Sequence, residues 1–94
     1  MVLGILTIQI HLPGCSSLKE KRGRLKPLLA RLHREFNVSA AEVDLQDVWQ
    51  NAVLAVALVS NEKDHVQRVL QRVVVWLESS WLDVEVVDDH LELL

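Results

Sequence analysis

The strongest constraint on the fold is the order in which hydrophobic periodicities follow one another along the 94 residues. Apolar and polar residues alternate over residues 2–12, which predicts a half-buried strand. A helical repeat follows, then two strand-like segments, a second helical repeat and a last strand-like segment. This β-α-β-β-α-β order predicts an α+β protein of ferredoxin-like architecture, a four-stranded antiparallel sheet with two helices packed on one face. A chain of this length supports one core, so we expect residues 1–94 to form a single domain.

The first helix is marked by its start signal and by an apolar stripe. Ser17 and Glu20 form a capping-box pattern, and Asn37 ends the helix. Pro27 lies inside it and removes a hydrogen bond to the carbonyl of Gly23, which predicts a kink between these two residues. The residues that recur at helical spacing and are expected to be buried are Leu18, Leu25, Leu29, Leu32 and Phe36.

Turn and cap residues bound the remaining elements. We expect strands at residues 38–45, within 48–60 and at 81–87, with a tail at 90–94 that extends the last strand or frays. Ser60 and Asn61 cap the second helix, whose predicted buried face comprises Val66, Val69, Leu70, Val73, Trp76 and Leu77. The three tryptophans are expected to anchor the core and the junctions between elements: Trp49, Trp76 and Trp81.

The third strand is apolar on both faces over residues 52–59. A sheet with helices on one side ordinarily exposes polar residues on the other side. Two interpretations stay open: small apolar side chains face solvent in the middle of the sheet, or a second copy of the chain covers them. The second interpretation predicts a homodimer through the sheet face or edge, with Leu3 and Ile5 adding to the patch. Its interface residues would be Val53, Ala55, Ala57 and Val59.

Charge is distributed unevenly along a chain whose net charge is −3. Residues 14–36 carry seven basic and two acidic side chains, whereas residues 37–94 carry three basic and eleven acidic ones. The basic helix predicts contact with phosphate, either in an RNA backbone or in a small anion near the helix start. The alternative is a helix face that is only solvated. The candidate contact residues are Lys19, Lys21, Arg22, Arg24 and Lys26. Strands 2–12 and 52–59 lack aromatic residues, so RNA would bind the helix and its loop by charge and shape, without stacking on the sheet.

No residue pattern indicates an enzyme, a cofactor or a metal centre. His11 and Cys15 flank the first loop, but a metal would need further ligands and a nucleophile would need an orienting group. An acylphosphatase-like site would need an arginine in the loop at residues 13–17, which has none. The acidic residues after the first helix are expected on a solvated strand edge: Glu42, Asp44 and Asp47. We therefore expect a non-enzymatic protein with no cofactor and no metal.

Cysteine content and apolar run lengths indicate the compartment. The single cysteine, Cys15, forms no intrachain disulfide and favours a reducing environment. Residues 1–10 are apolar but lack a basic segment and a cleavage site, which predicts a strand in place of a signal peptide. The longest apolar run, residues 52–59, is far shorter than the roughly 20 residues of a membrane helix. We expect a cytoplasmic protein with no membrane contact.

Three segments, in order, resemble one known family. They are Ser17-Leu-Lys-Glu-Lys-Arg22, Phe36-Asn-Val-Ser-Ala-Ala-Glu-Val43 and Asp47-Val-Trp-Gln-Asn-Ala52. The chain is similar, over essentially its whole length, to the YlxP-like family of small bacterial proteins of unknown function. The resemblance implies a ferredoxin-like fold. Genes of the family often lie near those for transcription, translation initiation and ribosome maturation factors, which implies a role linked to RNA or the ribosome. It assigns no catalytic residue.

Overall fold

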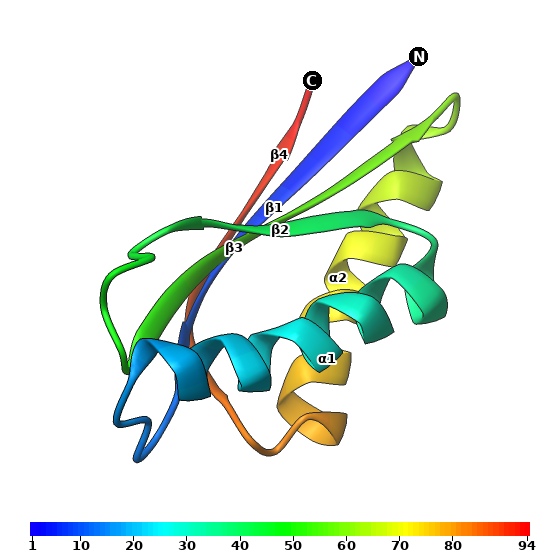
Figure 1. The fold of residues 1–94 in the computed structure, drawn as a ribbon. Helices are drawn as coiled ribbons and strands as arrows, with labels where there is room; N and C mark the ends of the chain where they lie inside the picture. The colour runs from blue at the N-terminus through cyan, green and yellow to red at the C-terminus, as the bar shows by residue number, and fades with distance from the viewer.

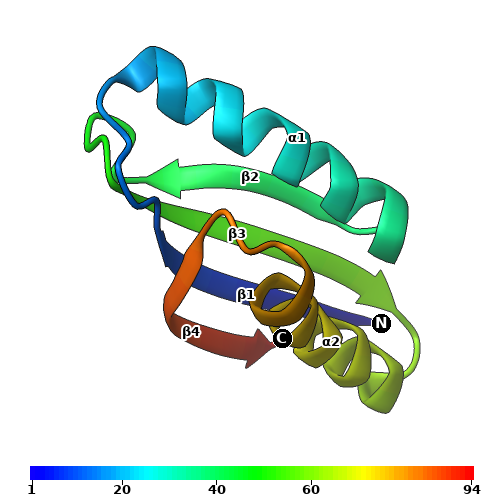
Figure 2. The ribbon, with the colours of Figure 1, turned by 90° about the horizontal axis from the view of Figure 1, so that it is seen from below.

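Four strands and two helices account for most of the chain, and the computed structural model describes all residues 1–94. Their order is β1 (Val2–His11), α1 (Leu18–Phe36), β2 (Ser39–Asp44), β3 (Asn51–Ser60), α2 (Lys63–Ser80) and β4 (Glu85–Leu93). The strands form one sheet in the order β2-β3-β1-β4, and each neighbouring pair is antiparallel. Both helices cover the same face of this sheet (Figure 1; Figure 2). The predicted α+β, ferredoxin-like architecture is confirmed.

The core lies between the sheet and the two helices. Strand β1 alternates as predicted, with Leu6, Ile8 and Ile10 buried and their neighbours half-buried on the other face. Gly4 lets α2 approach β1 closely, because a Cβ at this position would overlap the side chains of Val66 and Leu70. The helices contribute these buried apolar residues: Leu25, Leu28 and Leu32 from α1, and Val66, Val69, Leu70, Val73 and Leu77 from α2.

Helix α1 begins at the predicted cap. The Ser17 hydroxyl accepts a hydrogen bond from the Glu20 backbone N–H at 3.0 Å. The Glu20 carboxylate accepts one from the N–H of Ser16, at 2.7 Å, and this bond lowers the pKa of Glu20. The helix then runs as one element of 19 residues through Pro27, which lies on its exposed side. Asn37, in the left-handed region with φ of 51°, ends it.

Two boundaries differ from those predicted. Glu62, and not Ser60 or Asn61, is the N-cap of α2, and its side chain makes no cap hydrogen bond. Strand β4 starts at Glu85 and continues through the C-terminal tail, because pairing with β1 extends as far as Gly4 and Leu93. Neither helix is long and apolar enough to cross a membrane.

Candidate functional site

Lys21 lies on the buried side of α1, and its side chain is only 1% exposed. Its Nζ donates hydrogen bonds to the carbonyl oxygens of Leu45 and Val48, both at 2.7 Å. The same Nζ lies 2.7 Å from Oε2 of Glu42. The ammonium therefore makes two hydrogen bonds and one ion pair, all within the protein. The structure therefore corrects the expectation that Lys21 reaches an outside ligand, because its charge is used inside the protein.

Glu42 is the acidic partner that sequence analysis expected on a solvated edge. A β-bulge interrupts the pairing of β2 with β3 between Glu42 and Asp44. Glu42 lies opposite Leu54, a buried residue, and so faces the helices, whereas Asp44 lies opposite Val53 on the other face. The expectation of a solvated edge is therefore wrong for Glu42. Its carboxylate and the Lys21 ammonium join α1 to β2.

Arg24 is the second basic residue of α1 whose donors are used within the protein. Its Nε donates to Oδ2 of Asp83 at 2.9 Å, and its two terminal nitrogens donate to the carbonyl oxygens of Asp83 and Pro13. The hydrogen bond to Asp83 raises the pKa of Arg24. Arg24 thus ties the start of α1 to the loop before it and to the loop between α2 and β4.

The other three predicted contact residues, Lys19, Arg22 and Lys26, are exposed. None of them makes an ion pair or a side-chain hydrogen bond, in contrast to Lys21 and Arg24. At about 100° per residue they fall within roughly 60° of one another around the helix axis. We call these three residues the basic stripe. It is the part of the predicted contact set that the fold leaves available.

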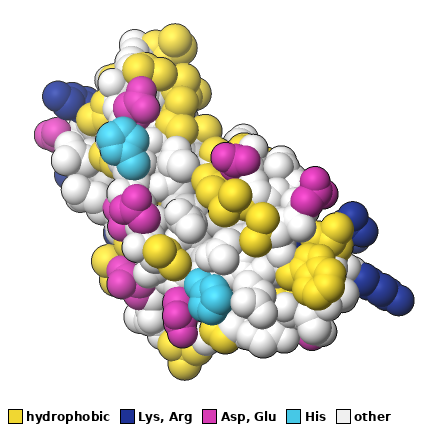
Figure 3. Space-filling view, turned by 90° about the vertical axis from the view of Figure 1, so that its left-hand side faces the viewer, with side chains coloured by type: hydrophobic (Ala, Val, Ile, Leu, Met, Phe, Trp, Pro, Cys, Tyr) yellow, Lys and Arg dark blue, Asp and Glu magenta, His cyan; other side chains and the backbone are white.

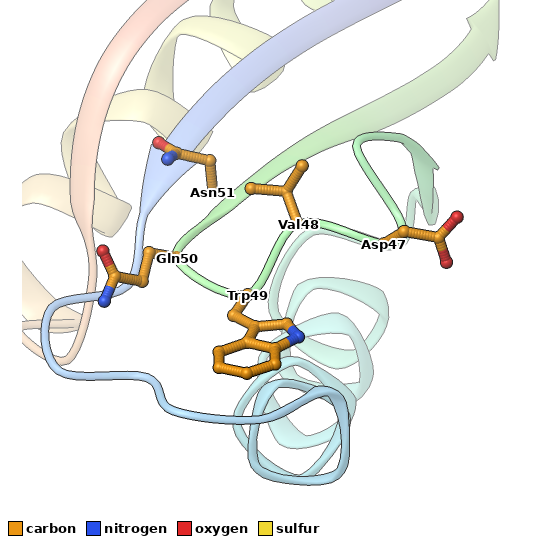
Figure 4. A pocket seen from close by; sticks show the side chains of 5 residues that line it. All are labelled: Asp47, Val48, Trp49, Gln50 and Asn51. Carbon is orange, nitrogen blue, oxygen red and sulfur yellow. The ribbon is translucent and has the colours of Figure 1, made fainter.

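Beside the start of α1, the loop between β2 and β3 exposes an aromatic ring. Trp49 is 50% exposed, so the expectation of a core anchor is wrong for this tryptophan. Trp76 and Trp81 do pack against the core, and their ring centroids are 5.6 Å apart. The loop encloses a shallow hollow of about 330 Å³ (Figure 4). It is lined by Asp47, Val48, Trp49, Gln50 and Asn51.

The sheet face opposite the helices carries the predicted apolar patch. Its β3 residues are Val53, Ala55, Ala57 and Val59, which alternate with buried neighbours. In the register of β1, Leu3 lies opposite Val59 and Ile5 lies opposite Ala57. Figure 3 shows apolar side chains along the middle of this face, with carboxylates beside them and Lys and Arg only at its margin. The residues proposed for a dimer interface therefore share one uncovered surface.

His11 and Cys15 are not brought together as a reactive pair. Cys15 is fully buried, and its Sγ lies 3.5 Å from the carbonyl oxygen of Ser17. His11 lies in β1 after the buried Ile10, on the face away from the helices. Nowhere in the chain do three or more His, Cys, Asp or Glu residues gather in a way that could hold a metal ion.

The fold and this site together define a small ferredoxin-like protein whose first helix holds a neighbouring loop from its inner side and presents cations from its outer side. The family described as "Protein of unknown function (DUF503)" matches residues 3–90. The chain is 36% identical over 78 residues to the "Uncharacterized protein YlxP" of Bacillus subtilis (strain 168), covering 83% of this chain and 85% of that protein. The chain therefore belongs to the YlxP family of unknown function, and the predicted resemblance is confirmed.

Proposed function

We propose that the protein is a non-enzymatic accessory factor of the cytoplasm that binds RNA on a ribosomal particle through the basic stripe. One observation carries the proposal. Lys19, Arg22 and Lys26 are exposed and unpaired on one side of a helix, in a chain whose net charge is −3. When such cations contact phosphates, the counterions condensed on the RNA are released, and this release favours binding. The role in translation that the family resemblance implies is of the same kind.

The proposed site is smaller than the set of five residues predicted from the sequence. Lys21 and Arg24 hold the loops around the helix start and do not themselves contact RNA. Replacing them would disturb the fold, so their variants are poor tests of binding. Lys19, Arg22 and Lys26 are the residues to change, because their side chains are exposed and make no ion pair or hydrogen bond within the protein.

The test is cosedimentation of the protein with ribosomal subunits and with total RNA over a series of salt concentrations. The variant Lys19→Glu/Arg22→Glu should lose binding. The matched control Arg68→Glu/Arg72→Glu makes the same change in net charge on the exposed side of α2 and should keep it. Absence of binding by the unaltered protein at low salt, or equal loss in both variants, would contradict the proposal.

A second function is favoured by the uncovered sheet face: a protein–protein interaction module that forms a homodimer and has no role with nucleic acid. The patch of Val53, Ala55, Ala57 and Val59 joins Leu3 and Ile5 across two paired strands. Sedimentation equilibrium would show a dimer that Ala55→Glu or Ala57→Glu dissociates. The control Val75→Glu, at an exposed position of α2, should leave it intact. A monomer at high protein concentration excludes this function.

A further inference from the structure

We propose that Trp49 and the basic stripe together form a binding site for single-stranded RNA, in which a base stacks on the indole ring and the backbone follows the start of α1. This inference rests on the proposed RNA binding and adds the class of RNA and the means of contact. It does not need aromatic residues on the sheet, which the central strands lack.

The exposure of Trp49 is the first observation. Half of its surface is open to solvent, although apolar burial is the main source of stability in a domain of this size. Phe36 and Trp81 each pair with Trp76, and neither of these aromatic pairs includes Trp49. A solvent-facing indole without an aromatic partner is the type of platform on which unpaired bases stack.

The backbone on both sides of Trp49 is fixed, which is the second observation. The carbonyl oxygen of Val48 accepts a hydrogen bond from Lys21 Nζ, and that of Gln50 accepts one from the N–H of Leu12 at 2.8 Å. The N–H of Val48 also donates to the carbonyl oxygen of Leu45, closing the turn. The ring is therefore carried by a loop that is ordered before any ligand binds, and this order reduces the entropy cost of binding.

The position of the loop is the third observation. Lys21 holds the loop from the inner side of α1, so the loop lies beside the start of this helix. At about 100° per residue, Arg22 is the residue of the basic stripe whose direction is closest to that of Lys21, and Lys19 and Lys26 lie farther around the helix. Figure 4 shows the Trp49 ring directed toward the start of α1 and the Asp47 carboxylate directed away from that ring. A strand stacked on the indole would pass Arg22 first and continue around the start of α1 to reach Lys19 and Lys26.

The same arrangement discriminates between single strands and duplexes. The face of a base is covered by its neighbours in a duplex, whereas a single strand can splay a base onto an aromatic ring. Stacking therefore favours single-stranded RNA, while the basic stripe alone would bind both forms.

The test is fluorescence anisotropy with a labelled oligouridine of about 12 nucleotides and an RNA duplex of the same length. Trp49→Ala should weaken binding of the single strand by roughly 5- to 150-fold, and Trp49→Phe should restore most of it. The salt dependence should stay unchanged in both variants, because the ring is uncharged. Val75→Ala serves as the control for loss of an exposed apolar side chain elsewhere. Circular dichroism checks that each variant is folded.

The outcomes separate this inference from the function on which it rests. If Trp49→Ala binds as the unaltered protein does while Lys19→Gln/Arg22→Gln/Lys26→Gln loses affinity, RNA binding stands and stacking is refuted. Equal affinity of the unaltered protein for the duplex and the single strand also refutes it. If the unaltered protein binds neither RNA at low salt, the proposed function itself fails.

Discussion

The five basic residues near the start of α1 carry the same charge but divide into two sets that differ in exposure and in hydrogen bonding. Lys21 and Arg24 make five hydrogen bonds to loops of the protein. Lys19, Arg22 and Lys26 make none and face solvent. Both sets lie within eight consecutive residues, so neither composition nor local net charge distinguishes them. The difference teaches that the orientation of a cation, and not the number of cations, decides what is left for a ligand.

Helical spacing is the cause of this division. Lys21 lies four, seven and eleven residues before Leu25, Leu28 and Leu32, which places it on the buried stripe of α1. A buried ammonium is costly unless it is paired and hydrogen-bonded, and the Glu42 carboxylate with two loop carbonyls meets that need. Lys21 and Arg24, the inner set, therefore stabilise the fold. The outer set, which is the basic stripe, faces solvent.

The largest effect is expected from removing the inner lysine. Lys21→Met leaves the Glu42 carboxylate without its cation and two carbonyls without a donor, and should lower the free energy of unfolding by about 3–5 kcal/mol. Urea denaturation measures this change. The double variant Lys21→Met/Glu42→Leu should recover much of the loss, since no buried charge then lacks a partner. A loss below about 1 kcal/mol in the single variant would show that the ammonium does not hold the loop.

A smaller effect is expected at Arg24, whose partner Asp83 is more than half exposed. Arg24→Gln should lower the free energy of unfolding by about 1 kcal/mol, because solvent screens the ion pair. A double-mutant cycle with Asp83→Asn isolates the interaction between the two side chains. Coupling indistinguishable from zero would mean that the pair adds nothing to the fixing of the helix start.

A third variant tests the acidic residue at the same helix start. The Ser16 N–H stabilises the charged form of Glu20 and lowers its pKa from the ordinary value of 4.5, so its contribution to stability is present above that value. The contribution is lost as pH falls through the pKa of the folded state. The midpoint temperature of thermal unfolding should therefore be lower for Glu20→Gln than for the unaltered protein near neutral pH, and the difference should vanish in acid. A difference that persists in acid would contradict this assignment.

The smallest effect on stability is expected from the outer set. Lys19→Gln/Arg22→Gln/Lys26→Gln should change the free energy of unfolding by less than about 0.5 kcal/mol, because these side chains are exposed and make no ion pair or hydrogen bond. The same variant should reduce the slope of log affinity for single-stranded RNA against log salt by about 2, for three lost phosphate contacts. A large loss of stability would remove the distinction between the two sets.

The fold was predictable because its signals are local. Alternation in β1, the Ser17 cap and the apolar stripes each reflect a backbone periodicity, and together they define the order of elements. The position of Pro27 inside α1 was also predictable, and the helix places this residue toward solvent. The two shifted boundaries depend on pairing with β1. Ser60 is still paired with Val2 at the end of β3, so α2 is capped later, at Glu62. Strand β4 starts at Glu85, which pairs with His11.

The site was less predictable because it depends on contacts across the fold. Lys21 was interpreted as a surface charge, although its spacing from the buried leucines was a usable signal. Glu42 faces the helices by simple alternation with Ala40, since both lie opposite buried residues of β3. The bulge at Val43 then turns Asp44, which alternation places on the same side as Glu42, to the other face. Trp49 was expected to anchor the core or a junction between elements, whereas hydrogen bonds from Lys21 and Leu12 hold its loop at the surface.

The most direct test of the division within α1 is acetylation of the four lysines, followed residue by residue by mass spectrometry with and without single-stranded RNA. Lys19, Lys26 and Lys63 should react quickly in the free protein, and Lys21 should react slowly. RNA should protect Lys19 and Lys26 and leave Lys63, on α2, unchanged. Rapid acetylation of Lys21 in the folded protein, or equal protection of Lys63, would contradict the account.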